Sequence, residues 1–194
     1  MWYVVQVVTG REDMVVTNVN KLVRSDLYKE CFNPTYKVQK RFKGVWYTVE
    51  RPLFPGYVII DTENPKDMAT ALRSITGAIR ILGNDFGHTP LPREEQRWIA
   101  DFTQKGNRVI GLSSGVIEGD QVIITEGPLV NTTAWIKSIN RHKRMAWLEL
   151  NLCGRTATVK AGLSIIRRSP ERRGAALQAL ESQGWAEDCA SRTN

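Results

Sequence analysis

The sequence contains few side chains that could catalyse a reaction or bind a metal ion. Its two histidines, His88 and His142, lie far apart, and the three cysteines, Cys31, Cys153 and Cys189, form no Cys-x-x-Cys pair. A metal site or a histidine-activated nucleophile needs several such side chains close together. We therefore predict no metal, no cofactor and no catalytic residue. The isolated cysteines, odd in number, favour a reducing cytosol.

The serines between two glycines at Gly111–Gly115 superficially match a nucleophile elbow. An elbow needs a strand before its serine and a helix after it, and the pattern predicts neither, so we interpret this segment as a linker. The sequence has no phosphate-binding glycine loop with its lysine and no dinucleotide fingerprint. Carboxylates such as Glu94 and Glu95 stand at a predicted helix start, where solvated acids are common. We predict a protein that is not an enzyme.

A compact cluster of cations, in contrast, lies in the C-terminal part of the chain. A basic turn at Arg141–Arg144 precedes an alternating segment in which Ala146 and Leu148 share one face, so that Trp147 takes the other face near the turn. An indole can stack on a base while Arg and Lys hold phosphates. The alternative, a solvated charged loop beside a tryptophan that covers a barrel edge, stays open. The candidate RNA-binding residues are Lys137, Arg141, His142, Lys143, Arg144, Trp147, Arg155, Lys160, Arg167 and Arg168.

Composition fits a globular, nucleic-acid-binding protein. The 194 residues are 42% hydrophobic and 24% charged, which excludes disordered and fibrous classes. Lys and Arg number 27 against 20 Asp and Glu, a net charge of +7 that suits a nucleic-acid partner. The longest apolar opening, Trp2–Val8, is much shorter than the about 20 residues of a membrane span. It also lacks the flanks of a signal peptide, so we expect a cytoplasmic protein with no membrane partner.

The elements that must position these side chains fall into two groups. The first is α+β, an antiparallel sheet flanked by helices. Its predicted strands are Trp2–Val8, a hairpin arm at Val45–Val49, Tyr57–Ile60 and Ala78–Leu82, and its helices start near Arg11, at Asn64-Pro65 and near Pro92. The second group is all-β, with strands at Gln121–Thr125, Ala134–Ile139, Met145–Leu152, Thr156–Lys160 and Leu163–Arg167, which indicates a small barrel.

These groups predict two domains. The first spans residues 1–105, a linker spans 106–115, the barrel spans 116–169, and a tail that we expect to fray spans 170–194.

Two motifs, in this order, resemble the NusG family of transcription elongation factors. One joins Trp2–Gln6 and Gly10-Arg11-Glu12 to Phe54–Val58, about fifty residues later. The other joins Gly119–Leu129 to Asn151–Arg155. The resemblance covers roughly residues 1–168 and implies the family's N-terminal domain followed by an SH3-like KOW barrel.

The resemblance implies that the first domain binds the clamp helices of bacterial RNA polymerase through an apolar pocket. Aromatic rings beside a Pro-Gly turn have the composition of a binding hot spot. The alternative for Phe54, a place in the core under the first helix, stays open, as does a core role for Met68. The implied polymerase-binding residues are Phe54, Pro55, Tyr57, Met68, Thr70, Ile81 and Leu82.

The second domain departs from general NusG proteins. Those proteins hold Rho or a ribosomal protein through an aromatic residue just before a Gly-Arg pair, and here that position is Cys153. Together with the basic turn, this resembles the specialised LoaP paralogues, which bind a structured leader RNA and make polymerase read through terminators. The resemblance also places the first domain's basic hairpin, with Lys37, Lys40, Arg41 and Lys43 beside Trp46, toward upstream DNA. The alternative, a plain exposed hairpin with no DNA contact, stays open.

We therefore predict a monomeric, operon-specific antitermination and elongation factor that binds RNA polymerase and an RNA hairpin. A general NusG whose KOW domain binds Rho or a ribosomal protein is the main alternative. A ribosomal-type KOW protein fits less well, because the first domain is complete.

Overall fold

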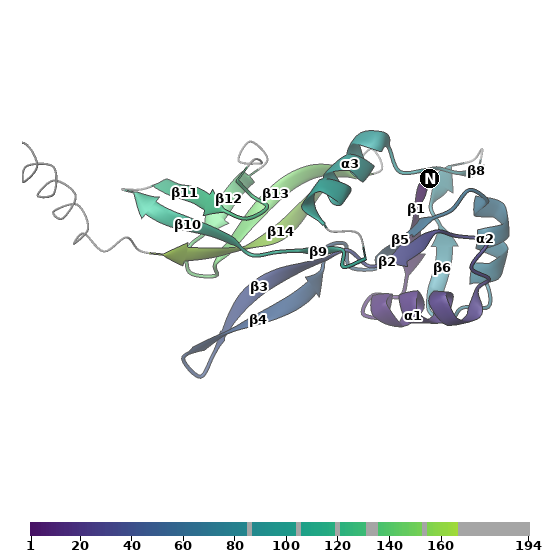
Figure 1. Ribbon diagram of the computed structural model, residues 1–194, viewed down its shortest axis with the longest axis horizontal. Helices are drawn as coiled ribbons and strands as arrows, with labels where there is room; N and C mark the ends of the chain where they lie inside the picture. The colour runs from purple at the N-terminus through teal and green to yellow at the C-terminus, as the bar shows by residue number, and fades with distance from the viewer. Residues whose placement is uncertain (85–86, 104–105, 119–120, 131–135, 153–154, 167–194) are drawn as a thin grey trace, which may run out of the picture.

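A four-stranded antiparallel sheet forms the centre of the N-terminal part (Figure 1). The computed structural model describes residues 1–84, 87–103, 106–118, 121–130, 136–152 and 155–166. The strands, in the order β2-β5-β1-β6, are β1 (Trp2–Val7), β2 (Glu30–Phe32), β5 (Tyr57–Asp61) and β6 (Ala78–Ile81). A two-stranded ribbon, β7 (Gly83–Asn84) with β8 (Gly87–His88), follows.

Helices cover both faces of this sheet, which explains the unbroken apolar run of β1. They are α1 (Glu12–Leu22), α2 (Pro65–Leu72) and α3 (Arg93–Phe102). Val5 packs into the buried cluster that includes residues of α1 and α2, whereas Val4 packs into the cluster that includes Trp98 of α3. Asn64 precedes α2 as predicted, but its side chain makes no capping hydrogen bond. The predicted α+β fold is confirmed.

A long hairpin extends from this body. It consists of β3 (Thr35–Phe42) and β4 (Val45–Pro52), and its root also pairs in parallel with β9 (Val109–Ile110). We call β3 and β4 together the hairpin. Figure 1 shows it as a separate arm below the C-terminal strands.

Five strands form the C-terminal sheet, in the order β11-β10-β14-β13-β12. They are β10 (Ser113–Glu118), β11 (Gln121–Glu126), β12 (Ile136–Asn140), β13 (Met145–Leu152) and β14 (Arg155–Ile166). The prediction of two strands, Thr156–Lys160 and Leu163–Arg167, was wrong, because one strand of 12 residues runs through Gly162. There a β-carbon would collide with the carbonyl of Lys37, so glycine allows close approach to the hairpin.

Part of the segment predicted as a linker is paired rather than free. Val109 and Ile110 form β9 against the hairpin, and Ser113 begins β10. Ile110 is buried in the cluster that also holds Leu53, which is more favourable than its exposure in a tether would be. Residues 170–194, predicted to fray, lie outside the described residues.

One buried cluster joins the two parts of the molecule. It includes Leu53 and Trp98 from the N-terminal part and Leu148, Val159 and Ala161 from the C-terminal sheet. The space left between them is only about 10 Å³, so the two surfaces are closely packed. This packing fixes how the C-terminal sheet stands relative to the hairpin.

Candidate functional site

The basic turn on the C-terminal sheet is an ordered structure. The Oδ1 atom of Asn140 accepts the backbone N–H of Lys143 at 2.8 Å. Arg144 adopts a left-handed φ of 52°, and its carbonyl accepts the N–H of Leu163 at 2.9 Å. These contacts hold the exposed side chains of His142 and Lys143 at one end of β13. An ordered turn keeps positive charge in place for a phosphate ligand at a low entropic cost.

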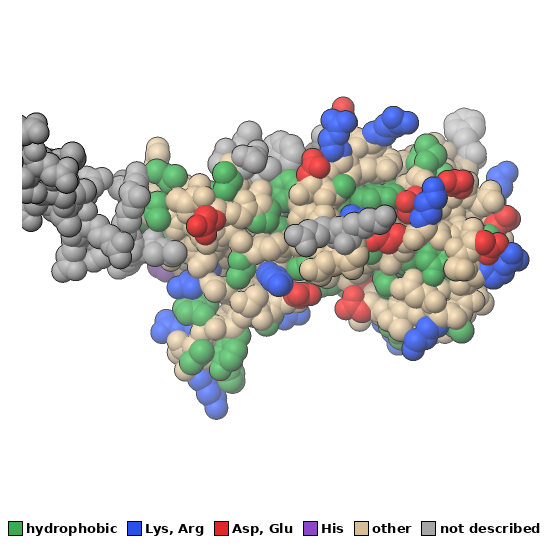
Figure 2. Space-filling model, in the orientation of Figure 1, with side chains coloured by type: hydrophobic (Ala, Val, Ile, Leu, Met, Phe, Trp, Pro, Cys, Tyr) green, Lys and Arg blue, Asp and Glu red, His purple; other side chains and the backbone are tan. Residues whose placement is uncertain are grey.

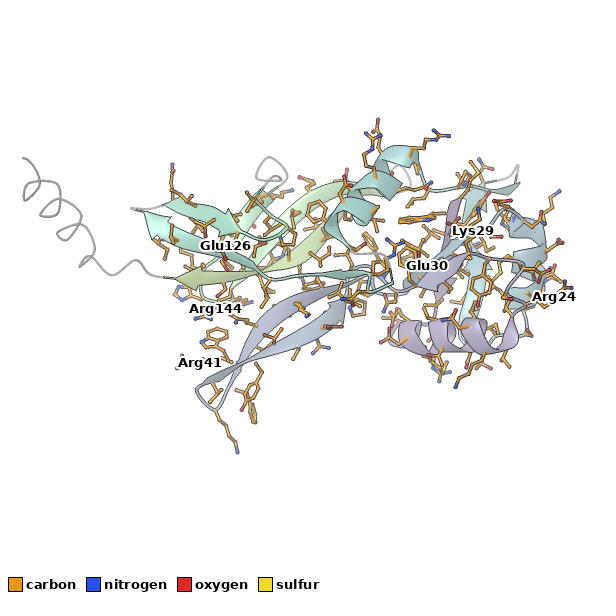
Figure 3. All side chains as sticks on the ribbon, in the orientation of Figure 1. Arg24, Lys29, Glu30, Arg41, Glu126 and Arg144 are labelled. Carbon is orange, nitrogen blue, oxygen red and sulfur yellow. The ribbon has the colours of Figure 1, made fainter. Side chains whose placement is uncertain are left out.

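Arg144 has a different role from its neighbours. Its Nη1 donates to Oε1 of Gln39 at 2.7 Å, and its guanidinium lies 4.0 Å from the centre of the Trp46 ring. Figure 3 shows Arg144 at the side of the C-terminal sheet that faces the hairpin, which carries Arg41. Arg144, predicted to bind RNA, is therefore occupied in holding the hairpin to the sheet.

The face predicted for Trp147 agrees with the structure. Ala146 and Leu148 are buried, and Trp147 between them is partly exposed. Its ring lines a surface depression of about 470 Å³ together with Lys137. Lys137 also pairs with Glu149, with its Nζ 3.2 Å from Oε1.

The other predicted RNA-binding residues divide into two groups. Lys160 is exposed and stands opposite Trp147 in the pairing of β13 with β14, and Arg141 is also exposed. Arg167, Arg168 and the side chain of Arg155 lie outside the described residues, as does Cys153.

The residues implied for polymerase contact differ widely in exposure. Phe54 is buried and packs edge-on against Trp98, with ring centres 6.2 Å apart. Met68 and Ile81 are buried in the cluster beneath α1 and α2. Exposed or partly exposed side chains are Pro55, Tyr57, Thr70 and Leu82. Which of these residues contact polymerase stays a prediction.

A buried carboxylate orders the loop between Phe54 and Tyr57. Glu12 accepts the backbone N–H of Gly56 at 2.7 Å. Burial raises the pKa of Glu12, but hydrogen bonds from backbone N–H groups, Gly56 foremost, outweigh it and hold the pKa below its ordinary value. Glu12 therefore positions the loop as an anion.

Sequence reasoning missed the contribution of the hairpin to this site. Figure 2 shows Lys and Arg side chains both on the hairpin and near the C-terminal sheet. Gln39, Trp46 and Arg51 line the groove between the hairpin and the sheet, together with Lys143 and Lys160. The basic composition of residues 37–51 was visible in the sequence, but its position beside the turn was not.

Within the described ranges, no group of three or more His, Cys, Asp or Glu side chains could hold a metal ion. None of the described helices is both long and apolar enough to cross a bilayer.

Comparison with known proteins decides the family. The family model described as "Transcription termination factor nusG" matches residues 1–100, more than half of the chain. The chain belongs to the NusG family. As a member of the NusG family it is a transcription factor of the termination/antitermination type and not an enzyme, as predicted.

Individual relatives are distant but align over most of their length. The transcription termination/antitermination protein NusG of Halalkalibacterium halodurans is 28% identical over 175 residues, covering 86% of this chain and 97% of that protein. NusG of Thermus thermophilus is 26% identical over 175 residues, covering 84% of this chain and 95% of that protein. NusG of Pasteurella multocida is 23% identical over 173 residues, covering 87% of this chain and 94% of that protein.

A solved structure supports the fold. "Domain interaction in Thermotoga maritima NusG" covers 83% of this chain and 92% of that chain, with a TM-score of 0.51 and 21% identity. At this identity the similarity shows a shared fold alone.

Proposed function

We propose that this NusG-family chain is an operon-specific, processive antitermination and elongation factor, most similar to the LoaP paralogues. Its N-terminal domain (1–105) binds RNA polymerase, and its KOW domain (116–169) binds a structured leader RNA. The observation that carries this proposal is the ordered basic turn, which holds Lys143 near Lys160 on the C-terminal sheet. Recognition of RNA hairpins rests largely on phosphate, 2′-hydroxyl and shape contacts, which such cations supply.

Polymerase contact is proposed for the loop that Glu12 orders. Pro55 and Tyr57 offer apolar surface to the clamp helices, and the partly exposed Leu82 packs, as Tyr57 does, against the cluster that includes Phe54. In this proposal Met68 and Ile81 act indirectly, because they are buried on the opposite face of the sheet, beneath α1 and α2, whereas Thr70 on α2 is exposed. A rigid aromatic side chain next to a Pro-Gly turn is a suitable anchor for a partner helix.

The tyrosine anchor is tested by Tyr57→Ala. We expect weaker binding to bacterial RNA polymerase without loss of the folded state, measured by co-migration with the polymerase and by circular dichroism. Tyr47→Ala, which removes an exposed tyrosine of the hairpin, is the matched control. Equal polymerase binding by the Tyr57 variant and the unaltered chain would remove this assignment.

The hairpin adds upstream DNA as a third proposed neighbour during elongation. Its cations Lys37, Lys40, Arg41 and Lys43 suit phosphate contacts. We propose that the factor acts as a monomer in the cytoplasm.

A general NusG factor whose KOW domain binds Rho or a ribosomal protein is the second candidate. The observation in its favour is that general NusG proteins align with 82–87% of this chain. A pull-down with purified Rho and with the ribosomal protein separates the two candidates. Retention of either protein, without selective RNA binding, would favour the general factor.

Selective RNA binding is tested by fluorescence anisotropy with the full chain. The probe is a labelled hairpin from the leader of the adjoining operon, and a scrambled single strand of equal length is the comparison. We expect selective binding that Lys143→Gln with Lys160→Gln weakens, with a salt slope smaller by about 1 for each lost phosphate contact.

The matched control also removes two exposed cations, Lys66→Gln with Arg73→Gln in and beside α2, and should bind as the unaltered chain does. Arg144 is left intact, because its replacement would also loosen the hairpin. If both probes bind equally and their binding is lost at higher salt, the result would contradict the proposed RNA function.

A further inference from the structure

The hairpin and the C-terminal sheet enclose a groove of about 680 Å³. Its walls come from two segments far apart in the chain, within residues 36–52 and residues 142–160. Lys40 and Arg51 lie on the hairpin wall, and Lys143 and Lys160 lie on the sheet wall. The groove is therefore a composite of the two parts of the molecule and belongs to neither alone.

Positive charge dominates both walls. The cations that line the groove are Lys40, Arg41, Arg51, Lys143 and Lys160. Among the described residues of the lining, Glu12 is the one carboxylate, and it is buried and accepts the N–H of Gly56. A concave surface lined by one sign of charge concentrates a polyanion strongly.

Aromatic and apolar side chains complete the lining of the groove. Tyr36 and Val38 are buried there, Met145 is partly exposed, and the partly exposed Trp46 ring is in contact with the Arg144 guanidinium. Cations beside an aromatic ring are typical of sites for unpaired nucleotides, which an RNA hairpin offers in its loop, because phosphates meet charge while bases stack. An acidic protein segment would use the cations but has no equivalent need for the rings.

The walls are held at a fixed separation. Arg144 crosses from the sheet to the hairpin, where it bonds Gln39 and stacks on Trp46. Gly162 lies against the carbonyl of Lys37, and the buried cluster of Leu53 and Leu148 packs behind them. A preorganised groove binds with a smaller loss of conformational entropy than two surfaces on a flexible tether.

We propose that the hairpin forms the second half of the RNA site, so that one RNA hairpin lies in this groove and contacts Lys40 and Arg51 on one wall and Lys143 and Lys160 on the other. This inference rests on the proposed RNA function. It changes that proposal in two ways, because the KOW domain then supplies only part of the affinity and Lys40 contacts RNA rather than upstream DNA. Arg144 is a positioning residue that sets the spacing of the walls.

The test compares three full-length double variants on the same labelled RNA hairpin. The hairpin-wall variant, Lys40→Gln with Arg51→Gln, removes two cations from the hairpin side of the groove. The sheet-wall variant, Lys143→Gln with Lys160→Gln, removes two cations from the sheet side. The control variant is Lys66→Gln with Arg73→Gln. We expect both wall variants to bind more weakly, each with a salt slope reduced by about 0.7–0.9 for every lost phosphate contact. The control keeps the original slope.

The outcomes separate the inference from the proposed function. Loss of binding in the sheet-wall variant alone would overturn the composite groove and leave the KOW site intact. Failure of the unaltered chain to bind the hairpin selectively would overturn both. A hairpin-wall variant that loses binding to duplex DNA of equal length, but not to RNA, would assign that wall to DNA and overturn the inference.

Photo-crosslinking reports directly which side chains lie next to the RNA in the complex. A benzophenone side chain is placed at Lys40, at Lys143 or, as the control, at Lys66. The composite groove predicts that the first two positions crosslink to the same RNA hairpin, whereas position 66 does not. Crosslinks from position 143 without any from position 40 would contradict it.

Discussion

Arg108 shows how a single buried cation holds the chain after α3 to the sheet. Its guanidinium forms a bidentate pair with Glu30, with Nε 2.9 Å from Oε1, and lies over the Phe32 ring at 4.5 Å. Only 8% of its side chain is exposed. A buried pair of this kind costs desolvation energy, but removal of one partner leaves the other charge uncompensated.

Arg108→Ala should therefore lower the free energy of unfolding by about 3–5 kcal/mol, measured by chemical denaturation. Arg24→Ala removes an exposed partner of Asp26 and should change the free energy by less than about 1 kcal/mol. Similar losses in both variants would contradict the distinction between the buried and the exposed pair.

The buried thiol of Cys31 makes the stability of the folded state depend on pH. Burial raises the pKa of its thiol from 9.0 to about 12, with a smaller contribution from Glu30. Because the folded state favours the neutral thiol, Cys31 contributes to the free energy of unfolding. This stabilisation is complete below the ordinary pKa and is lost as pH rises from about 9 toward 12.

In a variant with Cys153→Ser and Cys189→Ser, we expect the remaining Cys31 to react with a thiol reagent far more slowly in the folded chain than in guanidinium at pH 8. The thiolate, not the thiol, is the nucleophile, and burial blocks access as well. Equal rates in the two conditions would show that Cys31 is accessible in the folded state.

Strands β13 and β14 show where sequence reasoning succeeds and where it fails. Alternating apolar residues located β13 and the exposed face of Trp147, because period-2 patterning is a local property. The predicted break between Lys160 and Leu163 was wrong, since the close contact of Gly162 with Lys37 depends on a strand far away in sequence. The same limit hid β9, whose two residues pair only in three dimensions, and the contact of Arg144 with Gln39.

Gly162→Ala should therefore separate the hairpin from the C-terminal sheet or strain both. We expect a loss of about 1–3 kcal/mol in the free energy of unfolding, as for overpacked sites. Gly111→Ala is the matched control, because a β-carbon there meets nothing within 4 Å. Equal stability of the two variants would contradict the close approach at Gly162.

The shared core joins the N-terminal part and the C-terminal sheet into one folded unit rather than two domains on a flexible tether. Leu148 and Val159 of the C-terminal sheet pack with Leu53 and Trp98 of the N-terminal part. A closely packed apolar interface couples the folding of the parts that it joins, whereas a polar one permits independent motion. The placement of the groove walls depends on this coupling.

We therefore expect a single unfolding transition by calorimetry for the unaltered chain. Leu148→Ala should weaken this coupling and destabilise the molecule by about 2–5 kcal/mol. Ile123→Ala, at an exposed position of β11, should have little effect. Two well-separated transitions in the unaltered chain would show that the parts fold independently.

The function proposed for the whole molecule joins polymerase binding to RNA capture. Two modest contacts on one chain give a higher overall affinity than either contact alone, so recruitment is selective for transcripts that carry the hairpin. The most direct test is single-round transcription in vitro, with bacterial RNA polymerase and a template that has the leader hairpin upstream of a terminator. We predict that the full chain raises read-through on this template and not on one with the hairpin sequence scrambled. Equal read-through on the two templates, or no increase on either, would contradict operon-specific antitermination.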